Sequence, residues 1–233
     1  MSAIPICIGV IIINLYLIAN IITCICAFIG FNYGIVKFFK PRKAVYAQMI
    51  TLAVGCMALG RLYQTVRLLT GGNILDEFQL GILGVIGSLM FFFSANFGLM
   101  DSLADDRSKQ YLKYRIIPVA APLAAIALYL IFVFFADMPK IAKITGAVIT
   151  LFTVQSSYYN LKHLIFPDVE YGVIKCLKTY NLLALLYAFA CLFELIVLSR
   201  GSEIGALISG IIMGALLLAV VPSVERGIKK WTI

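Results

Sequence analysis

The chain has 233 residues, of which 62% are hydrophobic and only 13% charged, and its mean hydropathy is +1.01. One soluble core has too little interior to bury so much apolar surface, so the composition excludes an ordinary soluble domain and predicts an integral membrane protein. The formal net charge of +8 does not indicate nucleic-acid binding, because the basic residues gather in a few connections between apolar segments.

Seven apolar segments are each long enough to cross a hydrocarbon core of about 30 Å as a helix. Backbone groups in lipid must be hydrogen-bonded within their own segment, and nothing here alternates like a barrel strand, so all seven should be α-helices. In chain order they cover 7–31, 44–69, 78–100, 116–136, 142–161, 180–199 and 204–222. The predicted fold class is therefore an all-α integral membrane protein, with one seven-helix domain over residues 1–233.

Basic residues mark one side of the membrane. They follow spans one, three, five and seven, as Lys37, Lys40, Arg42, Lys43, Arg107, Lys109, Lys113, Arg115, Lys162, Lys175, Lys178, Arg226, Lys229 and Lys230. The positive-inside rule then puts the N-terminus outside and the C-terminus in the cytoplasm of a multi-pass protein, which we expect in the plasma membrane. Anionic headgroups at the cytoplasmic face are an expected partner, and nucleic acid is not.

Two cytoplasmic connections are longer than the others. Residues 101–115 form a charged linker that could extend span four as a helix, and residues 166–180 form either a short amphipathic interfacial helix or an irregular loop. The tail after Val221 is about a dozen residues long. Any signal must then pass through a separate cytoplasmic protein.

Two pairs of similar segments indicate an internal repeat. "NYGIVKFFKP" (32–41) is similar to "YYNLKHLIFP" (158–167). "LYQTVRLLTGG" (62–72) matches "LFELIVLSRGS" (192–202), so Gln64 corresponds to Glu194. Residues 1–100 and 142–222 would be parallel three-helix repeats joined by a linker helix at 116–136, a 3+1+3 layout found in secondary transporters. This layout is similar to that of the PQ-loop and SWEET sugar carriers, but the chain has no Pro-Gln dipeptide. Rhodopsins share the topology, but span seven has no lysine, so no family is assigned.

Two ionisable residues lie deep in predicted spans. Counting about 1.5 Å per residue puts Arg61 about 21 Å and Glu194 about 18 Å from the cytoplasmic side. We expect them to be paired or bridged by a ligand in a partly hydrated cavity, with polar neighbours Gln64, Asn14, Asn20 and Tyr63. The alternative is an ion pair that only holds two helices together.

A second polar group lies closer to the cytoplasm. It comprises Gln155, Ser156, Tyr159 and Asn160 on span five, with Ser94 and Asn96 on span three. Such a neutral region suits an uncharged polar solute or a lipid headgroup. Hydrogen bonding between helices is an equally good explanation. His163, the only histidine, is expected to be an ordinary interfacial side chain.

The leading functional prediction is a protein that binds a small polar or amphipathic solute and moves it by rocking one three-helix half against the other. The alternative is a seven-helix receptor or accessory subunit that acts through a cytoplasmic partner. A third reading is an enzyme that holds Mg²⁺ against a pyrophosphate or lipid substrate, with carboxylates from Asp101, Asp105, Asp106, Asp168 and Glu170. No resident metal or cofactor is expected, because the six cysteines lack metal-ligand spacing and no catalytic motif is present.

Overall fold

The computed structural model describes residues 15–40, 44–72, 80–101, 105, 108–135, 139–167 and 173–231, and all regular structure in these ranges is helical. The long helices are α1 (Leu15–Gly34), α2 (Val45–Leu69), α3 (Leu80–Ser94), α6 (Ala120–Phe135), α7 (Lys140–Ile165), α8 (Val173–Ser199) and α9 (Glu203–Trp231). Among the described residues, six helices are long and apolar enough to cross a membrane. The chain is therefore a multi-pass integral membrane protein built as a helical bundle.

Helix α7 differs from the other six because it carries more polar residues. Its 26 residues correspond to about 39 Å, which is long enough to cross the hydrocarbon core. Thr153, Ser156, Ser157 and Asn160 lower its hydropathy, and all four are buried. The polar side of α7 thus faces protein. The count of seven spans and the orientation of the termini stay predictions.

Several helices extend beyond the apolar segments that the sequence indicated. Helix α1 continues as a π-helical turn, Ile35–Phe39, past the predicted end at residue 31. The π-helical turn Ala95–Met100 that continues α3 lies within the predicted segment 78–100. Helix α9 runs to Trp231 with Pro222 inside it, so residues 222–231 of the predicted tail are helical. Hydropathy marks where a helix leaves the hydrocarbon, whereas the helix itself ends only where its backbone hydrogen bonding stops.

The two longer connections have different outcomes. The expected helical extension of span four is confirmed, since a 3-10 turn (Lys109–Tyr111), α5 (Leu112–Ile116) and a second 3-10 turn (Ile117–Val119) lead directly into α6. The prediction of a separate amphipathic helix in 166–180 is wrong for the described part of that segment. Helix α8 already begins at Val173 and continues without a break.

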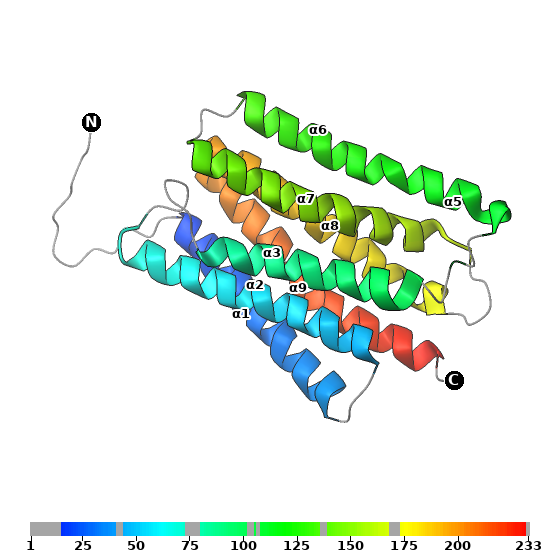
Figure 1. Cartoon of the computed structure of the whole chain (residues 1–233). Helices are drawn as coiled ribbons and strands as arrows, with labels where there is room; N and C mark the ends of the chain where they lie inside the picture. Colours follow the sequence, from blue (N-terminus) through cyan, green and yellow to red (C-terminus); the bar gives the residue numbers. More distant parts are fainter. Residues whose placement is uncertain are drawn as a thin grey trace.

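Six of the long helices form a closed ring in which α1, α2, α3, α7, α8 and α9 each pack on the next, and α9 packs back on α1. Helix α6 lies outside this ring, against α7 and to a lesser extent α8 (Figure 1). The ring is filled at mid-height by fully buried side chains, among them Met57, Leu89, Phe92, Tyr187 and Leu217. The peripheral α6 corresponds to the predicted linker helix 116–136, but the repeat itself stays a prediction.

The ends of α2 and α8 have the same local structure. Each helix is followed, two residues after its last residue, by a glycine with positive φ, +80° at Gly71 and +62° at Gly201, a conformation that glycine adopts without strain. In each case the backbone N–H of the residue after the glycine donates a hydrogen bond to a carbonyl in the last turn of the helix. Gly72 donates to Arg67, and Ser202 donates to Val197. The two segments matched in the sequence thus form the same turn. Ser202 is the N-cap of α9, and its side-chain oxygen accepts a hydrogen bond from the backbone N–H of Gly205.

Helices α2 and α3 approach each other at backbone contact. A Cβ atom on Gly84 would lie 2.5 Å from the Cα of Gly60 and 2.6 Å from the carbonyl oxygen of Cys56. Between α9 and α1, a Cβ on Gly210 would lie 2.8 Å from the Cβ of Ala19. Small residues allow such close helix packing in membranes, where dispersion contacts replace the hydrophobic effect as the driving force.

Candidate functional site

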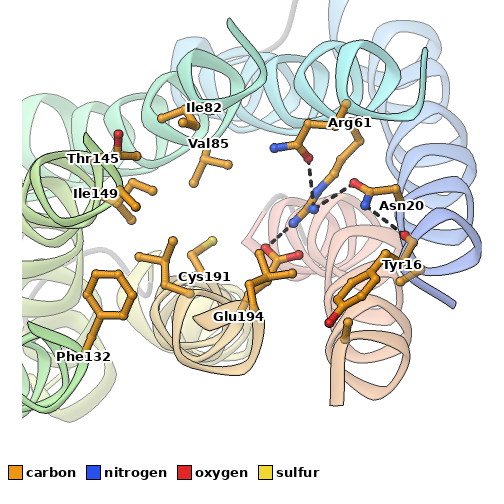
Figure 2. Close-up of a pocket in the computed structure, with 16 residues that line it drawn as sticks. Tyr16, Asn20, Arg61, Ile82, Val85, Phe132, Thr145, Ile149, Cys191 and Glu194 are labelled. Atoms are coloured by element: carbon orange, nitrogen blue, oxygen red, sulfur yellow. Dashed lines mark hydrogen bonds and ion pairs between the residues drawn. The ribbon is translucent and has the colours of Figure 1, made fainter. Parts of the chain in front are cut away.

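A cavity lies near the end of the bundle where α2 and α8 terminate and α9 begins (Figure 2). All seven long helices contribute to its walls. One wall is polar, with Tyr16, Asn20, Arg61, Gln64 and Glu194. The other is largely apolar, with Ile82, Val85, Phe132 and Ile149, and it carries the hydroxyl of Thr145 (Figure 2). The space open to the centres of water molecules is about 50 Å³. One water needs roughly 10–15 Å³ on this measure, so the cavity holds a few waters or a small chemical group.

Arg61 organises the polar wall. Its Nη1 donates hydrogen bonds to Asn20 Oδ1 at 3.0 Å and to Gln64 Oε1 at 3.1 Å. Its Nη2 forms an ion pair with Glu194 Oε2 and lies 3.6 Å from the sulfur of Met213. These contacts join α2 to α1, α8 and α9. The predicted Arg61–Glu194 pair is present, with Gln64 and Asn20 as its neighbours.

One donor of Arg61 is left without a partner. The side chain is only 3% exposed, yet its Nε–H meets no acceptor in the described protein. An unpaired buried donor costs about 1–3 kcal/mol. A water or another acceptor atom that reached this donor would remove that cost.

Two other predicted neighbours have separate outcomes. Asn14 lies outside the described residues. Tyr63 is a correction, because it lines a separate surface hollow with Val66, Arg67 and Thr70. Two residues along a helix turn about 200° around its axis, so a side chain at the depth of Arg61 can still point away from the cavity. Sequence reasoning missed Thr145 and Phe132, because a single threonine or phenylalanine in an apolar segment cannot be told from a packing residue.

The second predicted group is partly assembled. Asn96 donates to Asn160, and Asn160 donates to Ser156 Oγ at 3.1 Å, with all three side chains fully buried. Tyr159 instead packs edge-on against Phe93 and Phe97, and Ser94 and Gln155 are half-buried. Hydrogen bonding between α7 and the π-helical turn that continues α3 explains Asn96, Ser156 and Asn160. Solute binding by the whole group stays a prediction.

Below this group lies a buried ionic cluster that sequence reasoning did not predict. Lys162, 3% exposed, is 2.6 Å from Asp101 Oδ1 and 2.7 Å from Asp105 Oδ2. Arg115 donates to the same Asp105 from Nε at 2.8 Å, and His163 Nε2 lies 3.3 Å from Asp101. The cluster fastens the 101–115 connection to α7. It also neutralises two carboxylates that were considered as Mg²⁺ ligands; Asp106, Asp168 and Glu170 lie outside the described residues.

Acidification should weaken this cluster. Burial raises the pKa of the Asp101 carboxyl, but hydrogen bonds from His163 and Lys162 outweigh burial and hold the pKa below its ordinary value. A carboxyl with a lowered folded-state pKa stabilises the fold above its unfolded-state pKa, and this contribution is lost as the pH falls through the folded-state value. We therefore expect the thermal stability of the detergent-solubilised protein to fall below about pH 4.

The variant Asp101→Asn should be less stable at neutral pH and lose less stability on acidification than the parent. Glu203→Gln, which removes an exposed carboxylate near the other end of the bundle, is the control and should keep the parent profile. Identical acid profiles for Asp101→Asn and the parent would contradict the assignment.

Comparisons with protein-family models, curated proteins and solved structures found no match to this chain. The class that the fold defines is a multi-pass helical membrane protein. Any finer function must therefore be argued from the cavity and its chemistry.

Proposed function

We propose that the chain binds a small amphipathic solute in the cavity around Arg61 and carries it across the membrane. The observation that supports this most directly is the buried Arg61 Nε–H, which meets no acceptor among the described residues, in a side chain that lines a cavity together with Glu194. The polar wall would hold a hydrogen-bonding head of the solute. The apolar wall of Ile82, Val85 and Phe132 would hold its hydrocarbon part.

Opening toward the other side would require α3 to separate from α8. Below the cavity, Tyr187 of α8 donates a hydrogen bond to Ser88 of α3 at 2.9 Å, and Phe92 packs edge-on against Tyr187. Phe92 also contacts Tyr180, which lies nearer the N-terminal end of α8 than Tyr187, with 6.3 Å between ring centroids. These side chains close the bundle interior beneath the cavity. A carrier would alternate between this arrangement and one in which the aromatic contacts part.

Binding can be tested by thermal stabilisation of the purified protein with a panel of small zwitterions, short-chain carboxylates and alcohols. A ligand at about one hundred times its dissociation constant should stabilise the native state by about 2.7 kcal/mol. Arg61→Lys keeps the positive charge but lacks the guanidinium fork and its Nε–H, so it should abolish most of this stabilisation. Glu203→Gln, outside the cavity lining, should respond like the parent. Equal stabilisation of Arg61→Lys and the parent would contradict binding at this site.

Transport is tested separately, by counterflow of a stabilising solute into liposomes that contain only this protein. A carrier shows counterflow, which Glu194→Gln should reduce at least tenfold if loss of the ion pair removes about 1.4 kcal/mol or more of binding. Binding without counterflow would contradict transport.

A receptor or accessory subunit is the second candidate, and the buried Lys162 favours it. Lys162 fixes the 101–115 connection to α7, whose other end contributes Thr145 and Ile149 to the cavity wall. A shift of α7 on ligand binding would therefore move this surface. The receptor predicts ligand stabilisation without counterflow, together with a partner protein whose retention depends on that connection.

A further inference from the structure

A second hollow lies on the surface between α8 and α9, near their basic ends. Its volume is about 450 Å³, and it is lined by Thr179, Leu183, Ala219, Pro222, Ser223, Arg226, Gly227 and Lys230. The α9 residues recur every three or four positions and so share one face of the helix. Ala219, Ser223 and Gly227 are small, which leaves the space that the larger side chains of a packed interface would fill.

The charged residues of α9 divide between two faces at this end. Lys229 pairs with Glu225 at 2.9 Å, and Lys37 of α1 approaches the same carboxylate at 3.6 Å. Arg226 and Lys230, four residues apart on the groove side, are exposed and form no ion pair within the described ranges. The groove therefore presents two adjacent cations without a carboxylate from the described chain between them.

The groove also changes character along its length. Leu183, Ala219 and Pro222 form its apolar part, and the hydroxyls of Thr179 and Ser223 lie between this part and the two cations. Ser223 donates its own proton to the carbonyl of Val220 at 2.6 Å, so its oxygen is left as an acceptor. From Ala219 to Lys230 the helix rises about 16 Å. This distance spans the transition from acyl chains to headgroups in a bilayer.

We propose that this groove between α8 and α9 is a binding site for an anionic phospholipid. The lipid phosphate lies between Arg226 and Lys230, and one acyl chain follows Leu183 and Ala219 into the bilayer. Basic pockets between membrane helices select anionic headgroups by charge. A free phosphate ion satisfies only the cationic half of the groove, and the apolar half gives the lipid the additional contact.

The test measures which lipid stays with the protein. The full chain is reconstituted in phosphatidylcholine vesicles that contain a minor fraction of phosphatidylglycerol, extracted with mild detergent and analysed for bound lipid by native mass spectrometry. The parent should retain phosphatidylglycerol well above its fraction in the vesicle. Each surface cation contributes about fivefold to the affinity for an anionic lipid. The double variant Arg226→Gln/Lys230→Gln should therefore lower the selectivity for phosphatidylglycerol over phosphatidylcholine about 25-fold.

Two further variants separate the groove from general surface charge. Lys109→Gln with Lys113→Gln removes the same charge from exposed positions of another basic connection and should keep the parent selectivity. Ala219→Phe fills the apolar half from an exposed position, leaves both cations in place and should also lose phosphatidylglycerol. Thermal unfolding in pure phosphatidylcholine checks that every variant is folded.

The proposal would be overturned if the groove double variant and the Lys109→Gln/Lys113→Gln control lost the same amount of selectivity for phosphatidylglycerol. Equal losses would indicate that net charge alone attracts the lipid. Unchanged selectivity in Ala219→Phe would overturn it as well. Displacement of the lipid by inorganic phosphate at matched concentration would instead identify a soluble-anion site and reject the lipid assignment. Retention that is lost only in the groove variants supports the proposal, whether or not the cavity around Arg61 binds a solute.

Discussion

Replacing Arg61 by alanine is expected to lower the free energy of unfolding by about 3–5 kcal/mol, because the change leaves the carboxylate of Glu194 buried without its counter-ion. The Glu194 side chain is only 15% exposed, so solvent compensates little. Asn20 and Gln64 also lose the donor that satisfies their oxygens. The loss should exceed that of Asn20→Ala in the same cluster, since neutral hydrogen bonds between membrane helices contribute about 0.6 kcal/mol on average.

Thermal unfolding of Arg61→Ala, Glu194→Ala and the double variant in one detergent completes a double-mutant cycle. The double variant should be less damaged than the sum of the two single changes. Arg200→Ala, an exposed arginine at the same end of the bundle, is the control and should change stability by less than about 0.5 kcal/mol. Simple additivity of the two single effects would show that the pair is energetically uncoupled.

The second large effect is expected at the contact of α2 with α3. Gly84→Ala places a methyl group 2.5 Å from the Cα of Gly60, and the clashing atoms belong to backbone that cannot rotate away. The helices must separate, which we expect to lower the free energy of unfolding by about 3 kcal/mol or more. Because Gly60 precedes Arg61, the same separation should displace the guanidinium and weaken ligand binding in the cavity.

Gly87→Ala is a matched control on the same helix, one turn further along. Its new methyl group would meet only the side chain of Cys56, at 3.1 Å from the sulfur. Alanine also favours a helix over glycine by about 1 kcal/mol, so this variant should be close to neutral. Equal thermal stability of the two variants, measured by thermal unfolding, would mean that the close backbone approach at Gly84 is unimportant.

Depth within the bundle was predictable from sequence, whereas direction around each helix was not. Arg61 and Glu194 were placed at one level by counting residues, and they form an ion pair. The count succeeds because the rise per residue is nearly constant in any α-helix. The same count could not place Tyr63, because the rotation of a helix in a bundle depends on which neighbours its faces pack against.

The ionic cluster at the other end shows a different limit. The acidic residues that recur on one connection make Asp101 and Asp105 candidate metal ligands, and from sequence Lys162 indicates only the topology. In the fold Lys162 is buried between these two carboxylates. Residues about sixty positions apart meet here because α7 follows α3 around the ring, and no local pattern in either segment reports that neighbour relation.

The sequence by itself determined the class of this protein: a chain so apolar can be solvated only by lipid, and a chain in lipid must satisfy its backbone within helices. Tertiary structure alone decided the order of helices in the ring, the peripheral position of α6 and the cavity that combines Arg61 with apolar walls from α3, α6 and α7. The reason is physical. Hydropathy and helical rise are properties of a single segment. A cavity is lined by side chains from several helices, and these come together only when distant segments pack against each other.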